Sequence, residues 1–166
     1  MNHPQTFFLA DEAATLAFGA ALAPCVVPGL IIYLDGDLGA GKTTLVRGLL
    51  RALGHAGPVK SPTYALVEIH AVSGLHLYHF DFYRFNQPEE YLDAGLDEYF
   101  SGVGVCLVEW PERAAPYVPG PDLHIRLHVE GAGRLARIQT GSQRGEQCLT
   151  SFVPPAAMPS ATPPPA

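Results

Sequence analysis

The sequence has few of the features that mark secreted or membrane-spanning proteins. Its three cysteines are odd in number and far apart, so neither a disulfide framework nor a zinc site is expected. No uninterrupted apolar run approaches the length of a membrane span, and the N-terminus lacks a basic region followed by an apolar core. These absences predict a cytoplasmic protein that does not contact a membrane.

Positive charge is also scarce, with 10 Lys and Arg against 16 Asp and Glu and a formal net charge of −6. This balance argues against a broad, nonspecific nucleic-acid surface, although RNA could still be handled through a basic partner. The length of 166 residues suits one domain. We expect that domain to span residues 1–152. Residues 153–166 are rich in proline and lack hydrophobic periodicity, which predicts a disordered tail.

The most informative stretch runs from Gly36 to Thr44 and fits the G-x-x-x-x-G-K-[ST] pattern. An apolar run at residues 30–34 precedes it, and leucines with helical spacing follow it. In such a loop the glycines let backbone N–H groups converge on phosphate oxygens, and the helix adds its positive N-terminal end. Lys42 would reach the β- and γ-phosphates, and Thr43 would complete a Mg²⁺ shell. A glycine-rich turn before an ordinary helix is the alternative, but the flanking strand and helix favour a nucleoside triphosphate site.

The order of predicted elements indicates an α/β fold. We expect a single-domain P-loop NTPase with a central mixed parallel and antiparallel sheet flanked by helices. A helix capped by Asp11 is predicted over residues 11–22, and a short helix is predicted from Pro88 to near Gly95. The predicted strands are residues 65–70 and 75–82 as one hairpin, residues 103–108 as a buried strand, and residues 122–130 and 134–138 as a closing hairpin at the sheet edge.

Three other segments carry residues that could complete a site. Glu109 ends a buried strand, where a carboxylate can hold Mg²⁺, although a solvated strand-end charge is also common. Asp81 lies between aromatic residues and could either orient the attacking water or form a salt bridge with Arg84; its position in the sequence leaves both readings open. Thr63 follows a rigid Ser-Pro turn, where many P-loop proteins keep a γ-phosphate sensor, although Ser-Pro-Thr is also simply a good turn.

Two further observations concern single residue types. Trp110, the only tryptophan, could belong to the core or cover the nucleotide. His76 and His79 are three residues apart in a predicted strand and therefore point to opposite faces, so they make a poor metal-binding pair.

Other P-loop classes fit less well. An N-K-x-D guanine-reading motif is absent, as is the serine-glycine-glycine signature of transporter ATPases. A small-molecule or nucleotide kinase remains the main alternative, although its acceptor-binding arginines would have to come from the scattered Arg84, Arg113 and Arg134. A nucleotide-binding scaffold with incidental hydrolysis is a further possibility.

Four segments, in this order, resemble the TsaE (YjeE) family of bacterial ATPases for tRNA threonylcarbamoyladenosine biosynthesis: residues 36–44, 59–64, 79–84 and 107–111. Residues 11–15 also resemble the N-terminal helix of that family, and the match extends over about residues 9–150. The family usually has Leu at the position of Phe82. The resemblance implies a set of nucleotide-binding residues, namely Thr15, Asp37, Leu38, Gly39, Ala40, Gly41, Lys42, Thr43, Thr44, Trp110 and Arg134. It further implies Thr43 and Glu109 as Mg²⁺ ligands, and Lys42, Thr63 and Asp81 as catalytic residues.

The resemblance also implies a biological role. The family works with TsaB and TsaD, and TsaD transfers the threonylcarbamoyl group to adenosine 37 of tRNAs that read codons beginning with A. A member would be an ATP-driven switch on that complex, slow in hydrolysis alone and stimulated by its partners. It would meet tRNA only indirectly, through the complex.

Overall fold

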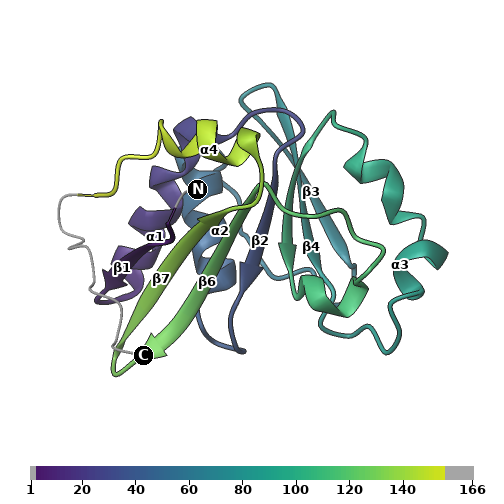
Figure 1. Cartoon of the computed structure of the whole chain (residues 1–166), viewed down its shortest axis with the longest axis horizontal. Helices are drawn as coiled ribbons and strands as arrows, with labels where there is room; N and C mark the ends of the chain where they lie inside the picture. Colours follow the sequence, from purple (N-terminus) through teal and green to yellow (C-terminus); the bar gives the residue numbers. More distant parts are fainter. Residues whose placement is uncertain (1–2, 156–166) are drawn as a thin grey trace.

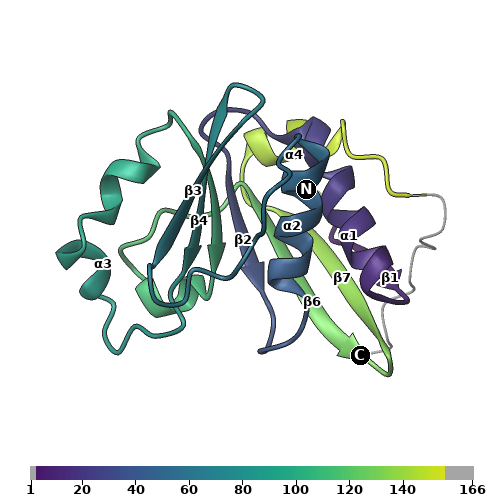
Figure 2. The same ribbon diagram turned by 180° about the vertical axis from the view of Figure 1, so that it is seen from behind.

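The computed structural model describes residues 3–155 and has a seven-stranded sheet at its centre (Figures 1 and 2). The strands are β1 (Gln5–Leu9), β2 (Ile31–Asp35), β3 (Val67–Val72), β4 (Leu75–Asp81), β5 (Val105–Glu109), β6 (Leu123–Glu130) and β7 (Gly133–Thr140). The α-helices are α1 (Glu12–Ala21), α2 (Lys42–Ala52), α3 (Glu90–Asp93) and α4 (Gln143–Leu149), and the 3₁₀ helices are η1 (Ala23–Cys25), η2 (Leu96–Phe100) and η3 (Pro111–Ala114). In the part of the chain that the structure describes, no helix is long and apolar enough to cross a membrane.

The strand order is β1-β7-β6-β2-β5-β4-β3. Strands β6, β2, β5 and β4 run parallel, whereas β3, β7 and β1 pair antiparallel with their neighbours. The predicted single-domain α/β fold with a mixed sheet is therefore confirmed. Because β2 and β5 are parallel neighbours, the loop after β2 and the residue that ends β5 meet at one edge of the sheet.

Side-chain alternation along the central strands divides the interior into two cores. On one face, Leu34 of β2 and Leu107 of β5 pack with α1 and α2, whose contacts include Phe18 and Leu49. On the other face, the aromatic side chains of β4 pack with those of α3 and η2, among them Tyr91. The helices α1 and α2 thus cover one face of the sheet, and Figure 2 shows them side by side.

The two covering helices approach each other closely through glycines. A Cβ atom added at Gly48 of α2 would lie 2.1 Å from the carbonyl oxygen of Leu16, and one at Gly19 of α1 would lie 2.0 Å from that of Leu45. Only glycine allows the two backbones to come this near. The contact sets the position of α2, and therefore of the loop that precedes it.

One strand, one α-helix and the three 3₁₀ helices were not predicted from the sequence. Strand β1 pairs with β7, so β1 forms the edge of the sheet, and the prediction that the β6–β7 hairpin lies at that edge was wrong. Helix α4 begins after Ser142, whose hydroxyl caps Gly145, and continues to a turn that buries Phe152 against Phe7 and Phe18. Of the predicted proline-rich tail, residues 153–155 have no regular secondary structure, and residues 156–166 lie outside the described residues.

Candidate nucleotide-binding site

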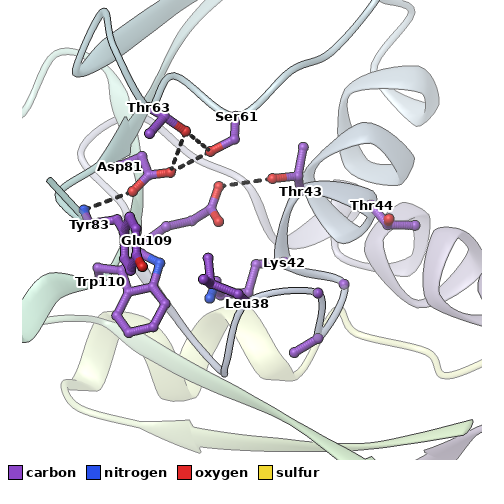
Figure 3. Close-up of a pocket in the computed structure, with 13 residues that line it drawn as sticks. Leu38, Lys42, Thr43, Thr44, Ser61, Thr63, Asp81, Tyr83, Glu109 and Trp110 are labelled. Carbon is purple, nitrogen blue, oxygen red and sulfur yellow. Dashed lines mark hydrogen bonds between the residues drawn. The ribbon is translucent and has the colours of Figure 1, made fainter.

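The loop between β2 and α2 has the backbone shape of a phosphate cradle. Gly36, Gly39 and Gly41 all have positive φ angles, of 153°, 79° and 106°. Helix α2 begins at Lys42 without a side-chain cap, so its first N–H groups are available to an external acceptor. A cavity of about 370 Å³ opens in front of this helix end and is bordered by the loop, Ser61, Thr63, Asp81, Tyr83, Glu109 and Trp110 (Figure 3).

Lys42 is folded back onto the loop. Its ammonium donates to the carbonyl oxygens of Gly36 and, at 3.4 Å, Asp37, and it lies 4.2 Å from the ring centroid of Trp110. Burial lowers the pKa of Lys42 below its usual value, and the negative charges of Glu109 and Asp81 partly offset that effect. The lysine is thus a buried cation between the loop and the acidic wall of the cavity.

Two donors, Thr43 and His79, hold Glu109 through the same carboxylate oxygen. Its Oε2 atom lies 3.2 Å from the hydroxyl of Thr43 and 2.6 Å from Nε2 of His79. His79 is fully buried and Glu109 is 3 % exposed, so both partners are shielded from water. A carboxylate oxygen only accepts, so Nε2 carries the proton that His79 donates to Glu109, while the other ring nitrogen, Nδ1, is buried without a hydrogen-bond partner among the described residues.

His79 is a site residue that the sequence reasoning missed. His76 and His79 lie on opposite faces of the strand, as predicted, and His76 is exposed. The informative comparison was with Asp81, two residues later, because that spacing puts both side chains on one face. That face of β4 is the one shared with Glu109 of β5, in register with Asp81.

Asp81 is surrounded by donors from two segments. The hydroxyl of Ser61 donates to its Oδ2, Thr63 lies 3.4 Å from the same oxygen, and the backbone N–H of Tyr83 donates to Oδ1 at 2.9 Å (Figure 3). Among the described residues no salt bridge joins Asp81 to Arg84, whose guanidinium instead contacts Tyr64. The salt-bridge interpretation of Asp81 is therefore wrong, and the predicted Ser-Pro-Thr loop lies against the carboxylate.

Two further candidates, Thr15 and Arg134, lie on the other side of the loop. A second hollow of about 260 Å³ is bordered by Thr15, the loop and Arg134. Arg134 donates to the carbonyl oxygens of Ala40 at 3.0 Å and Gly39 at 3.2 Å, and Thr15 is buried beneath Gly41. Thr44 borders both hollows, and Leu38, at 66 % exposure, projects from the tip of the loop. Asp37 and Arg126 both border a third, separate hollow.

The donor set suits a magnesium–nucleotide complex. The hydroxyl of Thr43 and the carboxylate of Glu109 are hard oxygen donors, the type that Mg²⁺ prefers, and phosphate oxygens commonly supply the remaining ligands of such an ion. Residues 3–155 contain no group of three or more His, Cys, Asp or Glu that could hold a metal alone. The residues present therefore fit an ion shared with a bound phosphate.

A glycine-rich loop between a buried parallel strand and a helix, with a strand-end carboxylate beside it, defines a P-loop nucleotide-binding protein. The family model described as threonylcarbamoyl adenosine biosynthesis protein TsaE matches residues 9–137. The chain belongs to the TsaE family.

Individual relatives agree with this assignment. The chain is 38 % identical over 152 residues to a tRNA threonylcarbamoyladenosine biosynthesis protein TsaE of Haemophilus influenzae, an alignment that covers 89 % of this chain and 96 % of the relative. A protein of the same name from Bacillus subtilis is 43 % identical, with 70 % and 73 % covered. The crystal structure of Bacillus subtilis YdiB superposes with a TM-score of 0.78 at 31 % identity and covers 92 % of this chain and 95 % of that chain.

Proposed function

We propose that this protein is a Mg²⁺-dependent ATPase of tRNA threonylcarbamoyladenosine biosynthesis, which acts on a TsaB–TsaD complex as an ATP-driven switch. The observation that carries the proposal is the convergence of Lys42, Thr43, Glu109 and Asp81 on one cavity at the end of α2. The names of its relatives support the pathway. The partners follow from the family resemblance, and the acidic charge of −6 agrees with contact to tRNA through the complex only.

Each side chain has a distinct part in the proposed reaction. The N–H groups at the start of α2 and the Lys42 ammonium bind the phosphates, and Arg134 and Thr15 border the region beyond the loop. Thr43 and Glu109 would hold Mg²⁺, which when bound neutralises charge that develops on the phosphates. Asp81 orients the attacking water, Thr63 stands beside it to sense the γ-phosphate, and Trp110 covers the site.

The hydrogen bonds of the site account for the slow turnover that we propose for the protein alone. Both oxygens of Asp81 already accept hydrogen bonds, from Ser61 on one side and from the Tyr83 backbone on the other. Lys42 is likewise bonded to the loop itself. Both groups must leave these partners before they can act on water and phosphate, and a partner that shifts residues 61–64 would release Asp81.

Two variants separate binding from hydrolysis. Lys42→Ala should abolish ATP binding in a calorimetric titration. Asp81→Ala should bind ATP with nearly the parent affinity while phosphate release falls by about 100-fold or more. If both variants hydrolysed ATP like the parent, the site assignment would be wrong. Transfer of the phosphate to a small acceptor in a metabolite screen would instead favour the kinase alternative.

A further inference from the structure

A further hollow lies beside Thr63, and the proposed reaction does not use it. This hollow, which we call the α3 groove, has a volume of about 500 Å³ and is bordered by Thr63, Tyr64, Leu66, Arg84, Phe85, Glu90, Asp93 and Ala94. Glu90 and Asp93, which border it, belong to α3, and α3 lies at the opposite end of the molecule from β1 (Figures 1 and 2).

An aromatic side chain is held in place at the rim of the α3 groove. Tyr64 is 84 % exposed, so its ring is available to a partner. The guanidinium of Arg84 lies 4.1 Å from the Tyr64 ring centroid, and its NH2 group donates to the Tyr64 hydroxyl at 2.9 Å. These two contacts order the ring before any partner arrives, which lowers the entropy cost of binding. Tyrosine and arginine are both enriched among the residues that dominate the binding energy of protein interfaces.

The charge around the groove identifies the kind of partner. Between Arg84 and Arg113 the chain contains no Lys or Arg, and the α3–η2 segment presents the exposed acidic residues Glu89, Asp93, Asp97 and Glu98. The one cation of the groove, Arg84, is already engaged with Tyr64. Leu92, at 44 % exposure, adds apolar surface on α3. A phosphate backbone would be repelled here, whereas a protein segment with Lys or Arg beside apolar side chains would be attracted.

The groove is joined directly to the residues that restrain Asp81. Tyr64 follows Thr63, and Arg84 follows Tyr83, so both halves of the Tyr64–Arg84 pair continue segments that bond to the carboxylate. Leu66 holds the loop in a left-handed conformation, with φ at 66°, and its carbonyl accepts from the Asp81 N–H at 3.1 Å. A partner that displaces Tyr64 therefore also displaces Ser61 and Thr63, because a short, strained turn connects these residues.

The geometry points to the α3 groove as the docking surface for a basic, apolar segment of the partner protein complex, with Tyr64 as its anchor. Docking there moves residues 61–64 and frees Asp81 to act on water. This inference rests on the proposed function, because it identifies the surface through which the partner stimulates hydrolysis.

The test compares five variants of the full chain, three in the groove and two controls, for their interaction with purified TsaB–TsaD. Tyr64→Ala should weaken binding to the pair by about 30-fold, and Asp93→Lys by about 10-fold, with a matching loss of stimulated ATP hydrolysis. Tyr64→Phe, which keeps the ring, should retain most of the affinity. Ile69→Ala and Glu146→Lys are the controls, an exposed apolar residue and an exposed acid away from the groove, and they should behave like the parent. ATP affinity and the unstimulated rate should not change in any of these variants.

The outcomes distinguish this inference from the proposed function. If the parent bound the pair without stimulation, and Tyr64→Ala bound it less well, the switch function would fail and the docking surface would stand. If the parent were stimulated and both Tyr64→Ala and Asp93→Lys were stimulated equally, the docking surface would fail alone. Absence of any binding by the parent would refute both. Direct tRNA binding by the parent that Tyr64→Ala abolished would show a nucleic acid as the occupant and overturn the inference.

Discussion

Replacing His79 by leucine tests how the buried carboxylate of the site is held in place. His79 is fully buried and donates from Nε2 to Glu109 at 2.6 Å, so its removal leaves a nearly buried carboxylate with the Thr43 hydroxyl as its remaining side-chain donor. A hydrogen bond to a charged group contributes about 1.5–3 kcal/mol. For a domain of this size, a loss of about 2 kcal/mol lowers the melting temperature by roughly 4–8 °C.

The same substitution should change how ATP binding depends on magnesium. His79 orients the oxygen donor that, with Thr43, would hold the ion, and loss of such an outer partner typically weakens metal affinity by about 10–100-fold. We therefore expect the Mg²⁺ concentration needed for half-maximal ATP binding to rise about 10-fold in His79→Leu. His79→Gln, which keeps an N–H donor, should recover part of both effects. The measurements are thermal unfolding and ATP titrations at a series of Mg²⁺ concentrations.

The matched control for these variants is His76→Leu, an exposed position on the same strand whose side chain points to the opposite face from His79. It should leave both the melting temperature and the Mg²⁺ dependence near the parent values. The reasoning would be refuted if His79→Leu had the melting temperature and the Mg²⁺ dependence of the His76→Leu control.

Two further predictions concern the fold. Gly48→Ala places a Cβ atom 2.1 Å from the Leu16 carbonyl oxygen and must separate α1 from α2, so denaturant unfolding should show a loss of about 1–3 kcal/mol or more. The control is Gly120→Ala, where a Cβ would meet no atom within 4 Å and φ is not positive, and it should lose less. Equal losses would contradict the close helix contact. The second concerns His70, whose pKa is held below its usual 6.5 chiefly by burial and further by the neighbouring His55. The unfolded chain therefore binds a proton at this position more readily than the folded chain, and the His70 contribution to stability is lost as the pH falls below about 6.5. His70→Phe should show a smaller fall in unfolding free energy between pH 7 and pH 5 than the parent, and an identical pH profile would exclude this effect.

Local patterns were enough to predict the parts of the fold that are set by neighbours in sequence. The phosphate loop, the β3–β4 hairpin and the Asp11 cap of α1 all follow from residue types at fixed spacing. The strand that delivers Glu109 also follows, because a continuous apolar run predicts a strand buried on both faces.

The elements that were missed depend on contacts between distant segments. Strand β1 is defined by its pairing with β7, from Gln5 opposite Ile138 to Leu9 opposite Arg134, and five residues carry no periodicity strong enough to show this. Helix α4 has a mostly polar sequence, and it is fixed by the burial of Cys148 and Phe152 against the N-terminal part of the chain.

The candidate site likewise combines residues that are placed by the local sequence with residues that only the fold brings together. Lys42 and Thr43 are placed by the loop pattern alone, whereas the meeting of Thr43 with Glu109 requires β2 and β5 to be parallel neighbours. The Ser61 contact with Asp81 requires the loop after α2 to return over β4, and nothing within either segment specifies this. Arg84 lies only three residues from Asp81, so the sequence suggested that pairing, whereas the observed contact with Tyr64 joins residues 20 positions apart and depends on the fold.

The most direct test of the central claim is the rate of phosphate release from ATP by the purified protein, alone and with TsaB–TsaD, in the parent and in Asp81→Ala. We predict slow release by the parent alone, a marked increase with the pair, and little release from Asp81→Ala in either condition. Equal rates for the parent and Asp81→Ala in the presence of the pair would contradict the account, since hydrolysis would then not depend on the carboxylate around which the site is built.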